Sequence, residues 1–213
     1  MLIDSVIPSA PWSLVVPVKG TPAAKSRMHG SPDLARALAL DTVESALKVA
    51  RVLVVTSAMA AAEFRSLGAE VILDPGGGLN AAIAYGIERA GNGPVAVLLG
   101  DLPALLAEEL ESVLGVAQGM TRSVVADESG SGTVITTALE PALHQPRFGI
   151  GSFRAHRTAG YAELVVPQEY GLRRDVDTRS DLVSLGFDRL GGHTREAVRT
   201  LGWLEDRTET ITP

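Results

Sequence analysis

The sequence predicts an α/β protein whose central sheet is mainly parallel and flanked by helices, with a small β-hairpin region after residue 120. Up to Val116, apolar strand-like runs alternate with helical patterns, which is typical of right-handed β-α-β crossovers. After Gly119, two strand-like runs lie close together around a Ser-Gly-Ser-Gly stretch, which favours a hairpin. These two patterns together indicate the fold class.

The elements follow in order along the chain. Strands are predicted at 13–19, 51–56 and 69–74, and a fourth strand ends at Asp101. Helices are predicted at 33–47, 59–67, 79–89 and 104–116. Beyond them we expect hairpin strands at 122–127 and 132–137, a short helix near Phe153, strands at 163–166 and 172–177, and helices starting near Arg179 and Thr194. No linker or repeat interrupts this pattern, so we expect one domain over 1–213, with its core at about 13–203 and a polar tail at 204–213.

Composition excludes several classes of protein. The 213 residues carry a net charge of −6, so there is no basic surplus to neutralise a nucleic acid. The chain has no cysteine, which excludes disulfides, thiolate zinc sites and a cysteine nucleophile and is compatible with the cytoplasm. The first twelve residues lack a basic leader region, and no apolar run reaches the roughly 18 residues that a membrane span needs. We therefore expect small-molecule partners, no nucleic acid and no membrane; the sequence leaves the oligomeric state open.

Acidic side chains stand at two predicted strand ends. The run Pro94-Val-Ala-Val-Leu-Leu-Gly-Asp101 reads as a strand buried on both faces, and ligands bind beyond the carboxyl ends of such strands. Asp175 and Asp177 are two residues apart on another predicted strand, so they would share one face. All three carboxylates can converge on a magnesium ion, although Asp177 or Thr178 would also serve as a helix cap.

Two loops are candidates for binding a nucleotide. Lys19, Gly20, Lys25 and Arg27 lie on a flexible loop after the first strand, where the cations would suit a triphosphate; a solvated basic loop is the alternative. Gly78 and Asn80 lie at the start of the predicted helix 79–89, where backbone can approach a base or ribose closely and the amide can bind its edge. A tight turn with a helix cap is the alternative there.

The segment Arg147-Phe-Gly-Ile-Gly-Ser-Phe-Arg-Ala-His156-Arg157 is a candidate anion pocket. Ser152 is a plausible helix N-cap, and His156 falls one turn later on the same face. Arg147, Arg154 and Arg157 add positive charge, so the segment suits a small phosphorylated acid, with a basic surface helix as the alternative.

In their order, these residues resemble the 2-phospho-L-lactate guanylyltransferase family, whose actinobacterial members are known as phosphoenolpyruvate guanylyltransferases. The resemblance runs from about Leu14 to Leu185 and is carried most specifically by the Arg-Phe-Gly…Ser…His segment, since Gly-Asp-Leu-Pro and Asp-Val-Asp-Thr occur in many nucleotidyltransferases. Met28 departs from the family, which more often has Leu there. The stretches that carry the resemblance are Pro17-Val-Lys19, Lys25-Ser-Arg27, Gly78-Leu-Asn80, Gly100-Asp101-Leu-Pro103, Gly132-Thr133, Arg147-Phe-Gly149, Ser152, His156 and Asp175-Val-Asp177-Thr178.

The resemblance implies a Rossmann-like nucleotidyltransferase fold, GTP as donor, one or two Mg²⁺ ions and a role in coenzyme F(420) biosynthesis. It also implies that Asp101 and Asp175 hold metal, and that Thr133, Gly149 and Ser152 contact the phosphorylated three-carbon acid. We therefore expect GMP transfer from GTP to phosphoenolpyruvate or 2-phospho-L-lactate, with release of pyrophosphate.

Three other functions remain open at this point. A molybdenum-cofactor or sugar-phosphate nucleotidyltransferase would share the fold and the aspartates but would not need the segment from Gly149 to His156. A glycosyltransferase could use Asp175-x-Asp177 as its metal motif, although that motif usually follows a mid-chain strand. A non-catalytic nucleotide-binding regulator would not need the aspartates together with the basic loop. No Ser-His-Asp or Cys-His spacing is present, which is consistent with an acceptor that is already an anion.

Overall fold

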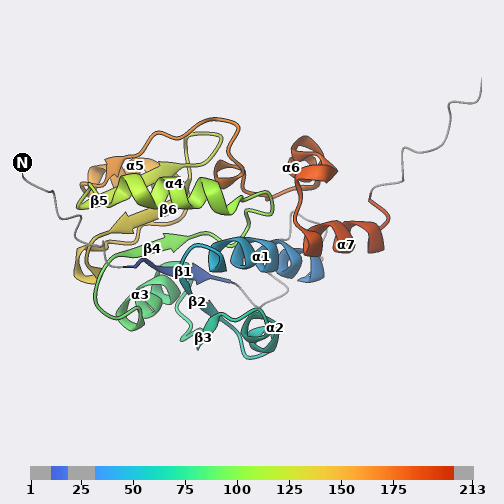
Figure 1. Ribbon diagram of the computed structural model, residues 1–213, viewed down its shortest axis with the longest axis horizontal. Helices are drawn as coiled ribbons and strands as arrows, with labels where there is room; N and C mark the ends of the chain where they lie inside the picture. The colour runs from blue at the N-terminus through green and yellow to red at the C-terminus, as the bar shows by residue number, and fades with distance from the viewer. Residues whose placement is uncertain (1–10, 19–31, 204–213) are drawn as a thin grey trace, which may run out of the picture.

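The computed structural model describes residues 11–18 and 32–203, which form a seven-stranded sheet with helices on both faces (Figure 1). The strand order is β3-β2-β1-β4-β6-β5-β7. The strands are β1 (Ser13–Pro17), β2 (Arg51–Thr56), β3 (Glu70–Leu73), β4 (Val95–Leu98), β5 (Arg122–Ala126), β6 (Thr133–Ala138) and β7 (Ala162–Glu163). The α-helices are α1 (Pro32–Leu47), α2 (Ala61–Ser66), α3 (Leu79–Arg89), α4 (Ala107–Ala117), α5 (Ser152–Thr158), α6 (Arg179–Leu185) and α7 (Gly192–Thr200). Short 3-10 helices are η2 (Pro141–Leu143), η3 (Gly171–Arg173) and η4 (Phe187–Arg189).

The sheet has the mixed pairing that the sequence predicts. Strands β3, β2, β1 and β4 are parallel to one another, and β7 is parallel to β5. Only β6 runs against its neighbours β4 and β5, and β5 with β6 forms the predicted hairpin. The mainly parallel α/β fold is therefore confirmed.

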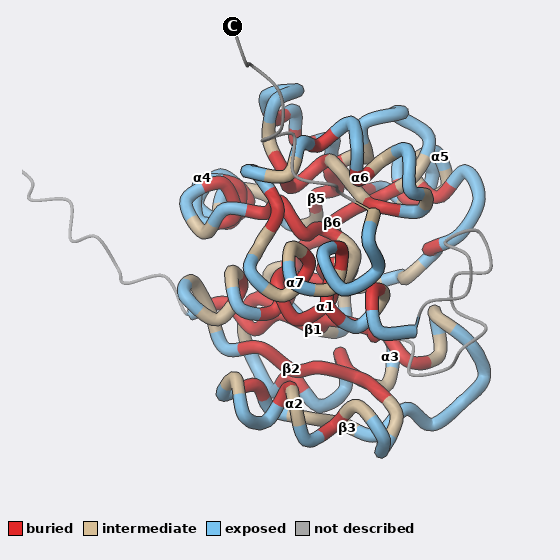
Figure 2. Tube along the Cα trace, turned by 90° about the vertical axis from the view of Figure 1, so that its right-hand side faces the viewer, coloured by how far each residue is buried: buried red, intermediate tan, exposed pale blue. Residues whose placement is uncertain are grey.

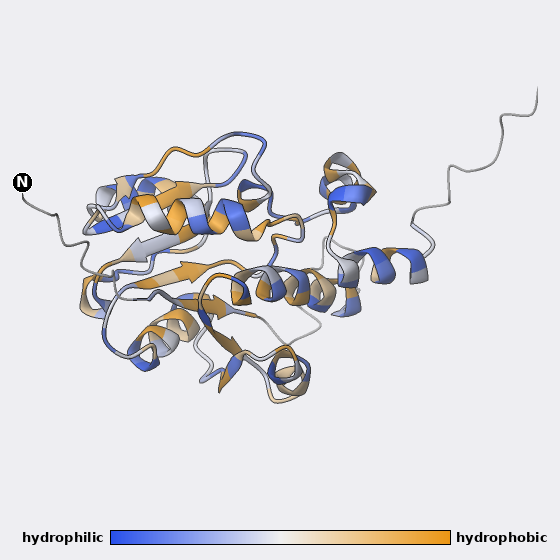
Figure 3. Ribbon diagram, viewed as in Figure 1, coloured by the Kyte–Doolittle hydropathy of each residue, from blue (hydrophilic) through white to orange (hydrophobic). Residues whose placement is uncertain are grey.

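Strand β1 lies in the middle of the sheet because both its faces are apolar. Leu14 and Val16 pack into a core cluster with side chains of α1, α2 and α4. Val15 faces the other way, into a cluster with α3. Figure 2 shows buried β1 and β2 enclosed by more exposed helices, and Figure 3 shows the same strands as apolar. Because β3, β2, β1 and β4 are parallel, their carboxyl ends lie at one edge of the sheet.

A third apolar cluster attaches the C-terminal helices to the rest of the fold. It joins α1 to α6, η4 and α7 and includes the buried Val176. Helix α7 lies alongside α1 in Figure 1. The stretch between η3 and α6, which holds two of the predicted metal ligands, is thereby packed against the start of α1.

Two predicted strands are wrong in extent or type. The strand expected at 163–166 is reduced to β7 at Ala162–Glu163, and the one expected at 172–177 is absent. Residues 171–173 form η3 instead, because buried Glu109 accepts hydrogen bonds from the backbone N–H groups of Gly171 (3.0 Å) and Leu172 (3.0 Å). Gly171 also approaches the Ala104 carbonyl so closely that a side chain there would collide with it. These tertiary contacts hold the chain in a turn.

Candidate active site

Three polar positions gather at the edge of the sheet where β4 and β5 end. Asp101 follows β4, and Asp127 follows β5 directly. Thr133 begins the antiparallel strand β6 and pairs with Ala126 at the end of β5. The Leu99 N–H donates to the Val134 carbonyl at 2.9 Å, which holds the loop carrying Asp101 beside the start of β6. The edge therefore combines carboxylates with a buried threonine.

Asp175 reaches the same edge from far along the chain. The Val176 N–H donates to the Asp101 carbonyl at 3.0 Å, while the Val176 side chain is fully buried. Asp175 and Asp177 flank this anchored valine; Asp175 is partly buried and Asp177 is exposed. Thr178, and not Asp177, caps α6: its hydroxyl accepts a hydrogen bond from the Asp181 N–H. The structure thus brings Asp101, Asp175 and Asp177 together, although not through the predicted strand.

The carboxylates crowd one another electrostatically. Burial, together with the negative charges of Asp101, Asp177 and Asp127, raises the pKa of Asp175 to about 7. Repulsion of this kind is relieved by a bound cation. The donor set is made of hard carboxylate oxygens, which fits Mg²⁺.

The aspartates are not packed as the complete ligand set of a single ion. Within residues 11–18 and 32–203, one trio of potential ligands has atoms that all lie within 4.8 Å of one another, namely Asp41, Glu44 and His193. The wider spacing of the sheet-edge aspartates suits Mg²⁺, which takes one or two carboxylates and completes its shell with phosphate oxygens and water.

The Asp41 trio has a structural explanation. The two carboxylate oxygens of Asp41 accept hydrogen bonds from the backbone N–H groups of His193 (3.0 Å) and Thr194 (2.8 Å) at the start of α7. Nε2 of His193 lies 3.7 Å from Oε2 of Glu44, and both of these side chains are partly exposed. Asp41 therefore acts as a cap that attaches α7 to α1.

Beside Thr133, the fully buried His156 links two of the predicted contact residues, Thr133 and Arg147. Its Nε2 accepts a hydrogen bond from the Arg147 N–H at 3.0 Å, so the neutral ring carries its proton on Nδ1. Nδ1 lies 3.1 Å from the Thr133 hydroxyl and donates to it. Burial lowers the pKa of His156 to about 4, which maintains this neutral form. The hydrogen of the Thr133 hydroxyl is then available to a ligand.

Ser152 is buried beside this link at the first position of α5. The N-cap is Gly151, with φ of 68°, and not Ser152 as the sequence indicates. Gly149 also has a positive φ, of 138°, and both it and Ile150 are exposed. The two glycines let the backbone turn sharply between Phe148 and α5.

Asn80 connects the predicted nucleotide loop to the loop that precedes α5. The Asn80 side-chain amide donates to the Phe148 carbonyl and accepts from the Phe148 N–H, both at 2.9 Å. These bonds engage the atoms that we expected to recognise a base edge, so in this structure Asn80 holds the two loops together. Gly78 is the N-cap of α3. It is the last of three consecutive glycines with positive φ, a backbone conformation that only glycine adopts readily.

Several predicted positions are set apart from the edge or lie outside the structure. Lys19, Gly20, Lys25 and Arg27 lie outside the described residues. Arg147 and Arg154 line an open hollow of about 460 Å³ on the outer face of α5. The Arg157 guanidinium donates to the Tyr161 carbonyl at 2.7 Å, so it has an internal partner.

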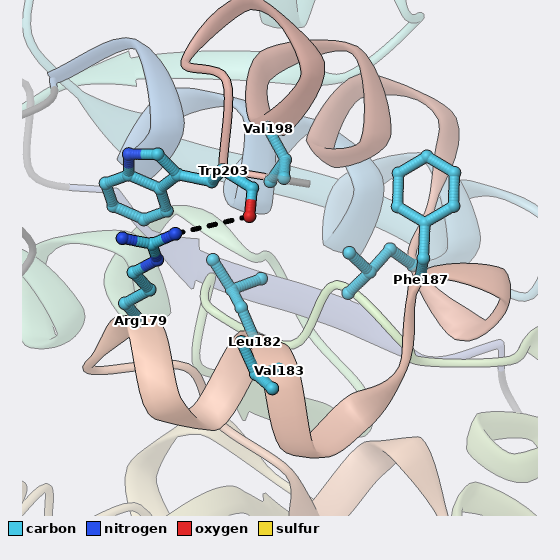
Figure 4. A pocket seen from close by; sticks show the side chains of 7 residues that line it. Arg179, Leu182, Val183, Phe187, Val198 and Trp203 are labelled. Atoms are coloured by element: carbon cyan, nitrogen blue, oxygen red, sulfur yellow. Dashed lines mark hydrogen bonds between the residues drawn. The ribbon is translucent and has the colours of Figure 1, made fainter. Parts of the chain in front are cut away.

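A second hollow, of about 60 Å³, has an apolar lining and lies between α6, η4 and α7 (Figure 4). On its rim, the Arg179 guanidinium donates to the Trp203 carbonyl at 3.3 Å. Leu182, Val183, Phe187, Leu190 and Val198 complete it. None of the aspartates predicted to bind metal lines this second hollow.

Sequence reasoning missed three residues that shape the edge: Asp127, Glu109 and Arg173. Asp127 had a readable signal, because it ends a predicted strand just as Asp101 does. Glu109 and Arg173 had none, since each acts on a backbone more than forty residues away.

Comparison with known proteins identifies the family of the chain. The family model described as guanylyl transferase CofC like matches residues 13–211. The chain belongs to this family. A phosphoenolpyruvate guanylyltransferase of Streptomyces coelicolor is 45% identical over 188 residues, covering 81% of this chain and 89% of the relative. One from Geodermatophilus obscurus is 44% identical, covering 86% and 92%.

A solved structure supports the fold of this CofC-like chain. A nucleotidyl transferase from Methanothermobacter thermautotroptrophicus superposes with a TM-score of 0.61 at 20% identity, covering 85% of this chain and 98% of that one. The nucleotidyltransferase-like fold expected from the sequence is thus confirmed. None of the described helices is long and apolar enough to cross a membrane.

Proposed function

We propose that this CofC-like protein transfers GMP from GTP to phosphoenolpyruvate and releases pyrophosphate, in the cytoplasm, as a step of coenzyme F(420) biosynthesis. The named activity of relatives about 45% identical over most of the chain supports this assignment. The observation that carries it is the meeting of Asp101 with Asp175, joined through the Val176–Asp101 backbone hydrogen bond, at the carboxyl edge of a parallel sheet.

The reaction requires positioning and charge neutralisation more than proton transfer. An oxygen of the acceptor phosphate forms the new bond to the α-phosphorus of GTP, and the bond from that phosphorus to the β-phosphate oxygen breaks. The acceptor is already an anion, so no general base is needed. Such a transfer needs no more than the aspartates and buried hydroxyls that the described part of the edge offers.

Each group of residues has a distinct task in this proposal. Asp101 and Asp175 would hold Mg²⁺, with Asp177 beside them, and the bound ion would neutralise phosphate charge. The predicted cations Lys19, Lys25 and Arg27 would offset the charge of the departing pyrophosphate. Gly20, Gly78 and Asn80 would border the nucleotide.

The acceptor acid would lie against the other side of the edge. Thr133 is best placed to donate a hydrogen bond to the acid. Because its hydroxyl oxygen accepts from His156, its hydroxyl hydrogen can bond to the ligand. Gly149 and Ser152 would supply the remaining contacts, and the backbone of Arg147, held in place by His156, would border them. His156 itself supports these groups from behind.

The direct test is pyrophosphate release from a matrix of donors and acceptors. GTP, CTP and ATP are each paired with phosphoenolpyruvate, 2-phospho-L-lactate, 3-phosphoglycerate and a sugar 1-phosphate, with Mg²⁺ or with a chelator. We expect the highest kcat/KM with GTP and phosphoenolpyruvate, abolished by the chelator. Preference for a sugar phosphate or another nucleotide would overturn the proposal, as would equal turnover without a divalent ion.

A further inference from the structure

The carboxylate of Asp127 organises the turn that leads into β6. Its Oδ1 accepts hydrogen bonds from the Ser131 N–H at 3.0 Å and from the Ser129 hydroxyl at 2.9 Å. Its Oδ2 accepts from the Gly132 N–H at 2.9 Å. A Cβ added at Gly132 would lie 2.4 Å from that same oxygen, so the carboxylate and the glycine are fitted to each other. One side chain thus sets the shape of the whole 127–132 turn.

This turn supports both halves of the predicted acceptor pocket. Gly132 directly precedes Thr133, whose hydroxyl faces His156. The Ser131 carbonyl accepts a hydrogen bond from the Phe153 N–H at 3.2 Å, in the first turn of α5 beside Ser152. A shift of the turn would therefore move Thr133 and Ser152 together.

The backbone of Asp127 is also attached to the segment that carries Asp175. The buried Arg173 side chain donates to the Asp127 carbonyl at 2.7 Å and to the Ala126 carbonyl at 3.3 Å. In return, the Glu128 N–H donates to the Arg173 carbonyl at 2.8 Å. Arg173 lies two residues before Asp175, so these bonds set the distance between the aspartates and the turn.

We propose that Asp127 is a positioning residue for the acceptor acid, which aligns Thr133 and Ser152 with the aspartates at the sheet edge. This inference rests on the proposed function, because it assigns these two residues to the acceptor. The hydrogen bonds of Asp127 to the turn, and not its charge, carry the role. Loss of the carboxylate weakens acceptor binding while the GTP side of the site stays in place.

Asp127→Asn tests this directly, because an amide nitrogen cannot accept the Gly132 hydrogen bond. We expect the KM for phosphoenolpyruvate to rise about 10- to 100-fold and the KM for GTP to stay within about 2-fold, as for loss of a supporting contact. Ser129→Ala removes one bond to Oδ1 and leaves both backbone bonds, so a rise of less than about 3-fold is expected. Gly132→Ala, which displaces the carboxylate, should reproduce the Asp127→Asn effect.

Asp41→Asn is the matched control, since Asp41 also accepts two backbone N–H groups but at the start of α7. It should lower the melting temperature with both KM values unchanged. The inference is overturned if Asp127→Asn leaves the KM for phosphoenolpyruvate unchanged, or if it raises both KM values equally.

Amide hydrogen exchange gives a readout that does not depend on the substrate. Faster exchange at Ser131, Gly132 and Phe153 in Asp127→Asn is expected, and unchanged exchange there would contradict the role. A wild-type protein that releases no pyrophosphate from GTP and phosphoenolpyruvate would overturn the proposed function, whereas a working wild type with an unaffected Asp127→Asn would overturn only this inference.

Discussion

Two acidic clusters in this protein differ in what surrounds their carboxylate oxygens. Asp41, near Glu44 and His193, uses both carboxylate oxygens to cap α7. Asp175 instead lies near Asp101, Asp177 and Asp127, whose charges add to burial in raising its pKa to about 7. The tighter cluster is therefore the structural one, and the looser cluster, where like charges repel, is the candidate for metal binding. Hydrogen-bond partners separate the two roles better than the density of acidic residues.

The largest expected effect comes from neutralising one carboxylate in each cluster. Asp101→Asn should reduce kcat/KM at least about 100-fold, because a charged metal ligand is lost. Its free energy of unfolding should not fall, since the change removes a repulsion. Asp41→Asn should do the opposite, costing about 1–2 kcal/mol of stability through the lost cap while kcat/KM stays within a few-fold. Pyrophosphate release and urea titration check both, and an active Asp101→Asn would remove the distinction between the clusters.

The histidines extend the comparison to pH. Burial, with a smaller contribution from the charge of Arg122, lowers the pKa of His144 to about 4. Burial also lowers the pKa of His156 to about 4, with smaller contributions from His144 and Arg147. Both rings also face Tyr161, whose pKa burial raises, so it is neutral in this range.

Because the unfolded chain takes up these protons near the ordinary histidine pKa of 6.5 and the folded chain only near 4, the unfolded state binds more protons in between. The contribution of the two histidines should be fully present above about pH 6.5 and fall progressively as the pH drops towards 4. Asp175, with its pKa raised to about 7, has the opposite dependence over the same range and offsets part of this slope. Urea midpoints across this range would check it. Asp175→Asn removes the opposing contribution, and a flat profile for that variant would contradict the buried neutral pair.

A smaller effect should follow from disturbing the path of the chain to Asp175. Gly171→Ala places a methyl group against the Ala104 carbonyl and should cost about 1–3 kcal/mol, with reduced turnover because η3 leads into the aspartate segment. Gly115→Ala is the control: it lies inside α4 with open space around it and should stabilise the protein by about 0.5–1 kcal/mol. Equal melting temperatures for the two variants would show that the close approach at Gly171 does not constrain the chain.

Local sequence patterns were sufficient where a residue's role depends on its own strand or helix. The predicted bounds 51–56 and 79–89 are those of β2 and α3. Asp101 follows β4, although that strand ends at Leu98 and not at Asp101 as predicted. The apolar runs and the glycines that flank them decide these features within a few residues.

The patterns failed where a distant group determines the conformation. Residues 172–177 read as a strand, but Glu109, sixty-two residues before Gly171, holds the start of that segment in a turn. His156 was expected to face the ligand because it follows Ser152 by one helical turn. It does share the buried side of α5, yet its nitrogens are engaged by Thr133 and the Arg147 backbone. No local spacing encodes these partners.

The most direct measurement is the anomalous diffraction of crystals grown with Mn²⁺ in place of Mg²⁺ and a non-hydrolysable GTP analogue. The account predicts one or two manganese peaks bound by the carboxylates of Asp101 and Asp175 and by phosphate oxygens of the nucleotide. A peak held instead by Asp41, Glu44 and His193, or a nucleotide bound at the sheet edge with no ion beside these aspartates, would contradict it.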